Sequence, residues 1–488
     1  MTRPREPQST PEPALRGGSW TVLSRVFVQL VQFAIFIFAA QLLQPEEFGV
    51  FALVAAFVVI LNQLAMAGWP EYIMQCEDDV YRLRSALFVA MSGGAVTVAL
   101  GISVSFLFLA TTDNTTAIWV GQILAVSVFF TSTGAAYSGV LNHQNRLTAA
   151  ALAVMAAEAV NLVVAVWALY AGYGILALAY GRLANSLLWC LATAAATRLL
   201  PTRHIGFDLL KEMAEFSRHI IATRILVNLR IYAATFIIGG FVGAAAVGYY
   251  RAGQRIVAGF EEIVGEPTRV LAWNLFRRAR TQGKGTSGFG PLSELFFRIQ
   301  LYGAVPLFIG VAVLAHDLTV GLLGAEWAPA APVLQILAIA SLIRLPGHAA
   351  VPILSVAGSA NMLPRLILIY SLITIACITV GAMFGIVTTA LAEVCAAIVA
   401  FVINAVVMHR HFDIHWLRIL ALSWRLIPAL IPALALPLLA HRFDLLADWH
   451  PLLRFFVLSL CSTLAYVPAL LFLDKTLRNT LGNTLRSR

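Results

Sequence analysis

The chain has 488 residues, of which 60% are hydrophobic and only 12% are charged, and its formal net charge is +9. A soluble domain of this length does not need so much apolar sequence, so the composition indicates a polytopic membrane protein. The positive charge does not indicate a nucleic-acid-binding protein, because the basic residues form no separate polar domain and lie in short loops, where membrane topology explains them.

Residues 1–18 are rich in proline and arginine and lack a short apolar core with a cleavage site, so they predict a disordered cytoplasmic tail and not a signal peptide. A helix needs about 20 apolar residues to cross a membrane, and fourteen later stretches reach that length, the eighth being the weakest. The sequence therefore predicts an all-α integral membrane protein with about 14 transmembrane helices. They lie near 19–43, 48–67, 85–110, 117–140, 147–171, 174–198, 217–240, 246–267, 295–315, 331–353, 363–384, 386–408, 417–440 and 451–473.

The first and seventh of these helices, with the loops that follow them, carry the same sequence pattern. At a common spacing of 199 residues, the matching pairs include Arg25 with Arg224, Gln29 with Asn228, and Gly49 with Gly248. Further matches at spacings of 197, 213 and 211 residues join Gly68 and Pro70 with Gly265 and Pro267, Gln122–Ala125 with Gln335–Ala338, and Gly174–Ile175 with Gly385–Ile386. We therefore expect two pseudo-symmetric six-helix lobes, 19–205 and 206–410, followed by 411–488 with the last two helices and a basic cytoplasmic tail.

The distribution of Lys and Arg predicts the orientation. With the N-terminus inside, nearly all basic loop residues fall on the cytoplasmic side, and the expected outside loops hold only Arg442 and Arg454. This bias is typical of cytoplasmic loops. An even number of helices per lobe gives both lobes the same orientation, so both termini are expected in the cytoplasm.

Polar residues recur on the first and seventh predicted helices. Arg25 and Gln29 lie one turn apart on one face, and Arg224 and Asn228 repeat that arrangement. Two interpretations remain open. The arginines either reach back to the cytoplasmic face, or, as the repeated amide favours, they line a polar cavity.

The eighth predicted helix carries charges deeper in the membrane. Arg251, Arg255, Glu262 and Glu266 follow one another on this helix, and a rise of 1.5 Å per residue places Arg255 about 14 Å from the outer face. The positive-inside bias does not explain such a residue. It belongs either to an internal ion-pair network or to a cationic wall for an anionic substrate.

Isolated acids on other helices are candidates for ion coupling. Glu158 lies on the fifth predicted helix and Glu393 on the twelfth, where the matching position of the first lobe holds Arg182. Coupling to protons or sodium needs a titrating acid, and Glu158, Glu262 and Glu393 are the candidates. The five cysteines are scattered without a CxxC motif or metal-like histidine spacing, so we expect no disulfide, no metal site and no cofactor.

Several stretches resemble one family. Gly17-Gly18-Ser19-Trp20 leading to Arg25, followed by Leu42-Leu43-Gln44-Pro45-Glu46-Glu47-Phe48-Gly49, is similar to the opening of bacterial polysaccharide transporters. So is Leu323-Gly324-Ala325-Glu326-Trp327-Ala328-Pro329-Ala330-Ala331-Pro332. The chain therefore resembles the polysaccharide transporter branch of the multidrug/oligosaccharidyl-lipid/polysaccharide exporter superfamily, which includes the O-antigen (Wzx-type) flippases.

The resemblance implies two bundles in a V around a central cavity that opens alternately to each side of the bacterial inner membrane. It implies a cargo of undecaprenyl-pyrophosphate-linked oligosaccharide for O-antigen, capsule or exopolysaccharide, and polymerase or export machinery as further partners. Arginines in such a cavity are expected to meet the pyrophosphate. Only Arg25 is a candidate because it lies at a matched position of the family motif. Arg224 is a candidate because the internal repeat matches it to Arg25, and Arg251 and Arg255 are candidates because of their predicted depth in the membrane.

Three other functions remain as alternatives. A drug or organic-cation antiporter of the same superfamily would favour acids in its cavity, and here intramembrane arginines outnumber them. A peptidoglycan-precursor flippase would share the electrostatics described above. A membrane-embedded glycosyltransferase or polymerase would need a large outside loop or a carboxylate cluster, and the outside loops are short, so we expect a transporter and not an enzyme.

Overall fold

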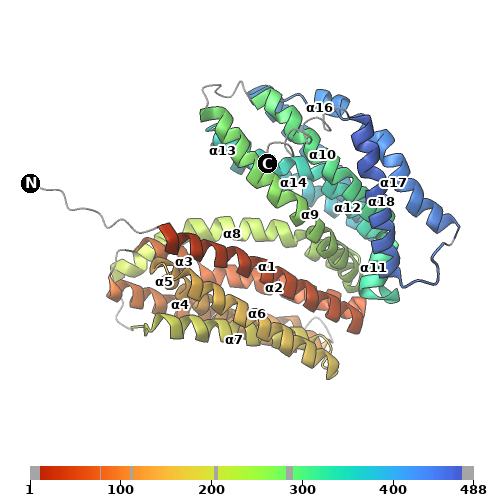
Figure 1. Cartoon of the computed structure of the whole chain (residues 1–488). Coiled ribbons are helices and arrows are strands. Elements are labelled where there is room, and N and C mark those ends of the chain that lie inside the picture. Colours follow the sequence, from red (N-terminus) through yellow and green to blue (C-terminus); the bar gives the residue numbers. More distant parts are fainter. Residues whose placement is uncertain are drawn as a thin grey trace, which may run out of the picture. The chain divides into compact units, whose positions relative to one another are not determined.

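A computed structural model describes residues 11–76, 79–109, 114–202, 207–281, 289–443 and 445–474 (Figure 1). These residues form helices and turns, without a strand in the described ranges. The chain divides into two compact units, Met1–Thr235 and Phe236–Arg488. The boundary lies inside one helix, α8 (Phe207–Phe241), and not in the loop that the sequence predicts near residue 205.

The N-terminal unit is a helical bundle built around one central helix. That helix, α5, contacts α2, α3, α4 and α7, and its most apolar stretch is 61% buried. Small residues allow this close packing: a Cβ at Gly139 would lie 2.9 Å from Cα of Pro70. The helices of this unit are α1 (Pro11–Leu42), α2 (Pro45–Met66), α3 (Trp69–Gln75), α4 (Val80–Leu109), α5 (Thr115–His143), α6 (Leu147–Tyr170), α7 (Leu176–Thr197) and the first part of α8.

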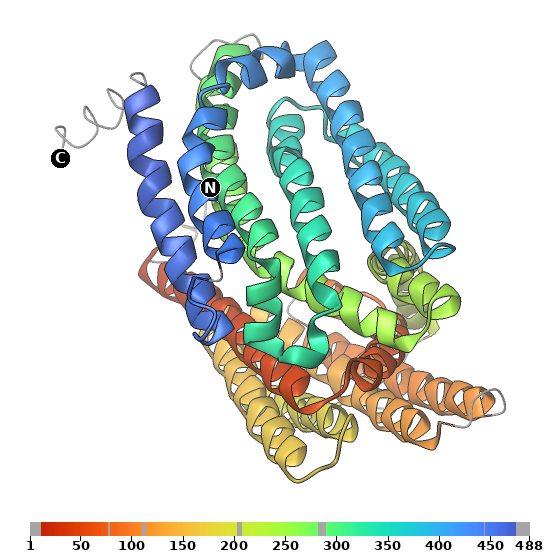
Figure 2. The same cartoon turned by 90° about the vertical axis from the view of Figure 1, so that its right-hand side faces the viewer.

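The C-terminal unit is organised around α12, which contacts α9, α10, α11 and α15. Figure 2 shows its last two long helices, α17 and α18 in blue, side by side. The helices are α9 (Ala244–Ala279), α10 (Phe289–Val313), α11 (Ala315–Leu323), α12 (Ala330–Arg344), α13 (Ala350–Val356), α14 (Leu363–Ala382), α15 (Ile386–Phe412), α16 (Trp416–Leu422), α17 (Leu426–Arg442) and α18 (Pro451–Leu473), with short 3₁₀ turns at Ala325–Trp327, Leu345–Ala349 and Ala360–Met362.

The helix boundaries and packing support the internal repeat. α1 ends at Leu42 and α8 at Phe241, and α2 begins at Pro45 and α9 at Ala244; each pair differs by the predicted 199 residues. The contacts of α5 with α2, α4 and α7 recur as contacts of α12 with α9, α10 and α15. Gly174 and Gly385, which also match, both have a positive φ, 56° and 113°.

Ten helical segments within the described ranges are long and apolar enough to cross a membrane, and the pair α16 and α17, bent by 59°, would make an eleventh. These eleven correspond to predicted spans. The helices at the sixth, seventh and eighth predicted spans, α7, α8 and α9, are not among these segments, and in α8 the described apolar stretch Ile231–Phe241 is shorter than a span. The count of fourteen therefore stays a prediction. The chain is nevertheless a multi-pass membrane protein.

The ends of the chain differ in one respect from expectation. α1 begins at Pro11, so residues 11–18, predicted as disordered, continue the first helix upstream. Residues 1–10 and 475–488, which hold the rest of the two predicted tails, lie outside the described residues.

Buried carboxylates fasten α18 at both of its ends. Asp474, fully buried, accepts hydrogen bonds from Arg298 (2.8 Å), Arg425 (3.2 Å) and the hydroxyl of Tyr302 (2.7 Å). At the other end, Asp317 of α11 is also fully buried and pairs with Arg454. Nε2 of His441 on α17 lies 3.2 Å from the same carboxylate. A charge in a low-dielectric interior persists only when such partners neutralise it.

Asp474→Asn removes the charge that holds two arginines, and we expect it to lower the free energy of unfolding by about 3 kcal/mol, because breaking a buried ion pair leaves the partner charges uncompensated. The melting temperature of the detergent-purified protein, followed by tryptophan fluorescence, measures the effect. Asp413→Asn is the control, because the Asp413 side chain is 79% exposed. Equal melting temperatures for the two variants would contradict a structural role for Asp474.

Candidate functional site

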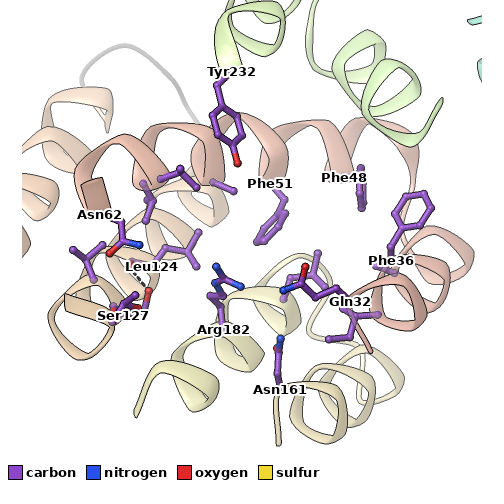
Figure 3. A pocket seen from close by; sticks show the side chains of 18 residues that line it. Gln32, Phe36, Phe48, Phe51, Asn62, Leu124, Ser127, Asn161, Arg182 and Tyr232 are labelled. Atoms are coloured by element: carbon purple, nitrogen blue, oxygen red, sulfur yellow. Dashed lines mark hydrogen bonds between the residues drawn. The ribbon is translucent and has the colours of Figure 1, made fainter. Parts of the chain in front are cut away.

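A cavity of about 300 Å³ lies inside the N-terminal unit, between α1, α2, α5, α6, α7 and α8 (Figure 3). Its wall combines polar and aromatic side chains. The polar ones are Gln32, Asn62, Ser127, Thr131, Asn161 and Arg182, and the aromatic ones are Phe36, Phe48, Phe51 and Tyr232. Amides, a guanidinium and rings around one space are typical of small-molecule sites, which are mainly apolar with a few polar groups that fix orientation.

A glycine brings two of the polar residues together. Gly181 precedes Arg182 on α7, and a Cβ at that glycine would lie 2.7 Å from Oδ1 of Asn161 and 2.8 Å from Cβ of Ala165. Only a residue without a side chain allows α7 to approach α6 this closely. The glycine thus places the Arg182 backbone beside the α6 residue that faces the cavity.

Behind the cavity wall lies a buried carboxylate, Glu158, which is 5% exposed. Nε2 of Gln32 donates to its Oε1, and Nδ2 of Asn161 donates to its Oε2, both at 2.9 Å. Within the described part of the chain Glu158 forms no ion pair. Two neutral amide donors therefore satisfy it and join α1 to α6.

Arg182 is the cationic residue of the cavity. Figure 3 shows its guanidinium pointing into the space between Gln32, Asn62 and Asn161. Among the described residues it has no hydrogen-bond or ion-pair partner, and its side chain is exposed to the cavity. A guanidinium that faces a cavity without a carboxylate is a donor of up to five hydrogen bonds to an anionic or hydroxylated ligand.

The matching positions of the C-terminal unit carry a different arrangement. By the spacings of 199, 213 and 211 residues, Phe51, Thr131 and Arg182 correspond to Tyr250, Arg344 and Glu393. There the Tyr250 hydroxyl donates to Oε1 of Glu393 at 2.8 Å, and Arg344 lies 3.4 Å from Oε2. Arg344 also lies 3.6 Å from a second carboxylate, Glu261. This unit therefore contains a closed ion-pair network where the N-terminal unit has an unpaired cation.

The four residues predicted on the first and seventh helices lie elsewhere in the N-terminal unit. Arg25 and Gln29 are exposed on α1 and do not line the cavity. Arg224 forms an ion pair with Glu71 of α3. The amide of Asn228 donates back to the Arg224 carbonyl oxygen at 2.8 Å, so this repeated amide serves its own helix.

The predicted cationic wall lies on α9 of the C-terminal unit. Arg251 donates to the amide oxygen of Gln254 at 2.7 Å. Arg255, half-buried, interacts electrostatically with Glu262 two turns later. This electrostatic attraction is compatible with the ion-pair interpretation, and both arginines keep partly exposed side chains, which is compatible with the cationic wall.

Sequence reasoning did not identify the cavity. The sequence identified Arg182 only as the charge-reversed match of Glu393, and it did not predict Glu71 as the partner of Arg224. The charge reversal between Arg182 and Glu393 was the signal in the sequence that could have indicated the cavity. When two repeats share a backbone position but carry opposite charges there, the side chains must have different partners in each copy. Glu158, which the sequence predicted as an isolated intramembrane acid, is joined by the fold to Gln32.

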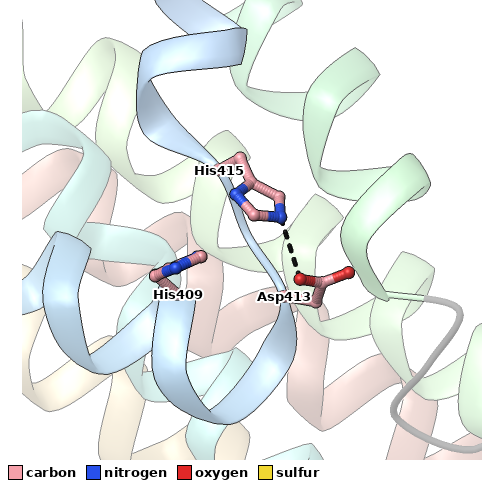
Figure 4. A group of neighbouring side chains, drawn as sticks. All are labelled: His409, Asp413 and His415. Atoms are coloured by element: carbon pink, nitrogen blue, oxygen red, sulfur yellow. Dashed lines mark hydrogen bonds and ion pairs between the residues drawn. The ribbon is translucent and has the colours of Figure 1, made fainter.

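One cluster of metal-type donors occurs among the described residues, at the turn between α15 and α16 (Figure 4). It comprises His409, Asp413 and His415, all exposed, with donor atoms within 4.8 Å of one another. Nε2 of His415 lies 2.8 Å from Oδ1 of Asp413. Asp413 has a positive φ of 56° as the C-cap of α15, so this contact stabilises the turn without requiring an ion.

Comparison with known proteins gives consistent matches. Residues 38–332 match a family model described as polysaccharide biosynthesis protein. The chain is 24% identical over 483 residues to the succinoglycan biosynthesis transport protein ExoT of Rhizobium meliloti (strain 1021), covering 97% of this chain and 96% of that one. Among solved structures, it is similar to the lipid II flippase MurJ in an inward closed conformation, with a TM-score of 0.71, 14% identity, and 95% and 99% of the two chains covered. An inward-facing multidrug resistance transporter of the MATE family gives a TM-score of 0.60 at 14% identity, with 81% and 95% covered.

Gly181→Ala is expected to lower the free energy of unfolding by about 1–3 kcal/mol, because the added methyl group overlaps Asn161 and forces α7 away from α6. The melting temperature of the purified protein measures this change. Gly303→Ala in α10 is the matched control, because nothing lies within 4 Å of a Cβ at that position. A Gly181→Ala protein as stable as the Gly303→Ala protein would show that the close contact does not limit the packing of the two helices.

Proposed function

Because this chain belongs to the polysaccharide biosynthesis protein family, we propose that it flips undecaprenyl-pyrophosphate-linked oligosaccharide repeat units from the inner to the outer leaflet of the bacterial inner membrane. The product serves lipopolysaccharide O-antigen, capsule or exopolysaccharide synthesis. The observation that carries the proposal is the family match, extended over nearly the full length by the similarity to a succinoglycan transport protein. Family and relatives are transporters, so the chain is not an enzyme.

The physical task of such a protein is to hide a polar head group during its passage. Sugar hydroxyls and a pyrophosphate lose their hydrogen-bond partners in hydrocarbon, and each unpaired group costs roughly several kcal/mol. We assign the pyrophosphate to the arginines of a cationic central cavity that works by alternating access, with Arg25, Arg224, Arg251 and Arg255 as the candidates. Guanidinium forks match phosphate oxygens in geometry and charge.

The predicted amides and acids complete the assignment. Gln29 and Asn228 are proposed to contact the glycan next to the arginines. Glu158, Glu262 and Glu393 stay the candidates for proton or sodium coupling. The two buried acids among them, Glu158 and Glu393, already accept hydrogen bonds that a bound ion would have to replace. Both termini are proposed to be cytoplasmic, and polysaccharide polymerase or export machinery is the expected partner on the outer side.

Two related functions share this fold. The similarity to MurJ keeps a peptidoglycan-precursor flippase as the second candidate, and the MATE similarity is compatible with a drug or organic-cation antiporter. The family match favours the polysaccharide cargo over both. In the N-terminal unit, the cavity presents a cation to its ligand, which disfavours a cationic drug at this place.

Deletion of the gene tests the proposal. We expect polyprenyl-linked repeat units to accumulate in the inner leaflet while surface polysaccharide falls, because synthesis continues without transfer. Extracted lipids are quantified beside the surface polysaccharide, and a membrane-impermeant sugar oxidant applied to whole cells reports the leaflet. Unchanged amounts of both would indicate an antiporter, lethality through cell-wall failure would indicate a peptidoglycan precursor, and lipid accumulated in the outer leaflet would indicate a polymerase defect.

Arg255→Ala distinguishes the cationic wall from a structural ion pair. If Arg255 holds cargo, we expect flipping to fall by about tenfold or more with the melting temperature nearly unchanged, since a charge-assisted hydrogen bond contributes about 1.5–3 kcal/mol. Arg269→Ala is the control, because within the described ranges this exposed arginine pairs only with its neighbour Glu266 one turn away. Glu262→Gln completes the test: equal losses of melting temperature in Arg255→Ala and Glu262→Gln would assign Arg255 to the ion pair instead.

A further inference from the structure

We infer that the cavity of the N-terminal unit is a subsite for one carboxylate-bearing sugar of the cargo, with Arg182 as the partner of its carboxylate. The inference rests on the proposed function and deepens it by assigning a chemical class to the sugar. Its basis is the different electrostatics of two matching sites in the same chain.

The first step is the cost of an unpaired charge. A cationic side chain within a membrane-embedded helical unit normally pairs with an acid or with backbone carbonyls. The fold supplies such partners to other intramembrane arginines: Arg344 meets Glu393, and Arg298 meets Asp474. Arg182 has no such contact with any described residue, although Figure 3 shows it pointing into the cavity. An anionic ligand would supply the ion-pair partner of Arg182.

The second step is the comparison of the two repeats. At the matching position the C-terminal unit supplies its own carboxylate, Glu393, which takes a hydrogen bond from Tyr250 and the charge of Arg344. In the N-terminal unit the acid is replaced by Arg182 and the tyrosine by Phe51. The same backbone position thus holds an ion-paired acid in one unit and a cation without a partner among the described residues in the other. The complementary group for Arg182 is therefore a carboxylate that the ligand brings.

The third step concerns the other polar atoms of the wall. Oδ1 of Asn62 is buried and receives no hydrogen bond from any residue that the structure describes. The hydroxyl groups of Ser127 and Thr131 already donate to backbone oxygens of their own helix, at 2.6 and 2.9 Å, and retain acceptor capacity. A buried acceptor without a donor destabilises the protein, because it has lost its hydrogen bonds to water. The cavity wall therefore offers acceptors to hydroxyl donors of a ligand whose carboxylate pairs with Arg182, and a sugar acid carries both kinds of group.

The fourth step is size and the apolar wall. A volume of about 300 Å³ is at the lower end of small-molecule sites, roughly 300–1,000 Å³, and suits one or two sugar rings but not a complete lipid-linked repeat unit. The rings of Phe36, Phe48 and Phe51 supply an apolar surface for the C–H face of a pyranose. A bare inorganic anion would leave this surface and the Asn62 oxygen without contacts.

A nearby carboxylate modulates the site. Glu158 lies behind Gln32 and Asn161, whose amide hydrogens it occupies. Its negative charge opposes an incoming carboxylate, partly offset by those two donors. Removing this charge should strengthen binding, whereas removing the charge of Arg182 should weaken it. The two substitutions thus act in opposite directions, which a purely structural role of the cavity would not produce.

Ligand binding to the full-length protein in detergent tests the inference. The probes are glucuronate, glucose, acetate, pyrophosphate and chloride at matched ionic strength, and the readout is the shift in melting temperature with concentration. We expect a saturable shift with glucuronate, none with glucose or chloride, and a weaker one with acetate. Arg182→Gln should weaken glucuronate binding by roughly tenfold or more, and Glu158→Gln should strengthen it, while Arg198→Gln, at an exposed arginine of the same unit, should not change it.

Several outcomes would overturn the inference. Equal shifts with glucose and glucuronate would exclude a carboxylate partner. A shift with chloride or acetate as large as with glucuronate would indicate a small-anion site without sugar recognition. A pyrophosphate response lost in Arg182→Gln would assign the cavity to the lipid end of the cargo. An Arg182→Gln protein that melts at the wild-type temperature and binds glucuronate normally would remove Arg182 from the site.

A cellular measurement separates this inference from the proposed function. In a deletion strain, Arg182→Gln should slow export of a polysaccharide that contains a uronic acid and leave export of a neutral one unchanged. If the wild-type protein restores neither, the proposed function is wrong. If the wild-type restores both and Arg182→Gln does so equally well, the function stands and only the assignment of the cavity fails.

Discussion

The pairing of charges in a low-dielectric interior is the constraint on which this structure depends. A polytopic helical protein gains little from apolar contacts between helices, because lipid is equally apolar, so polar contacts and close packing join its helices. Here a few buried acids make those contacts. Asp317 and Asp474 fasten α18, Glu393 joins α15 to α9 and α12, and Glu158 joins α6 to α1. Each acid has donors from at least one other helix, which is why the exception at Arg182 is informative.

The internal repeat explains how one fold holds two kinds of site. Both units use the same packing scheme, with α5 and α12 at their centres and matched helix boundaries. Backbone geometry is therefore shared, and side chains at matching positions diverge. In the C-terminal unit, Tyr250, Arg344 and Glu393 satisfy one another, which adds stability but leaves no charge for a ligand. In the N-terminal unit, the corresponding positions leave the Arg182 guanidinium facing the cavity, without a partner among the described residues.

The sequence predicted the elements that depend on local pattern. Apolar length located the helices, and the spacing of 199 residues was confirmed at the ends of α1 and α8 and at the starts of α2 and α9. Local pattern has limits even so. Gly68, with a φ of 80°, separates α2 from α3, whereas the matching Gly265 lies inside α9, which continues through Pro267. Identical short motifs thus gave a break in one unit and an uninterrupted helix in the other.

The site was less predictable because its contacts join residues far apart in the chain. Arg224 and Glu71 are separated by 153 residues, and Gln32 and Glu158 by 126. Helical periodicity gives the face of a residue but not the helix it meets, so the stripe of Arg25 and Gln29 was recognisable and the partner of Arg224 was not. The family match assigns the chain to the polysaccharide biosynthesis proteins, and it too leaves these pairings open.

The position of the cavity relative to Arg25 connects the two proposed assignments, Arg25 to the pyrophosphate and Arg182 to a sugar carboxylate. Gln32, which lines the cavity, follows Arg25 by two turns of α1, a rise of about 10 Å. A cation for the pyrophosphate at Arg25 and a cation for a sugar carboxylate at Arg182 would therefore engage one cargo at two levels of the same unit. Binding at both levels would favour a repeat unit that carries an acid near its lipid end over one that carries none, because the neutral cargo leaves the Arg182 charge without a partner. Selectivity would then follow from the same rule of charge pairing that holds the helices together.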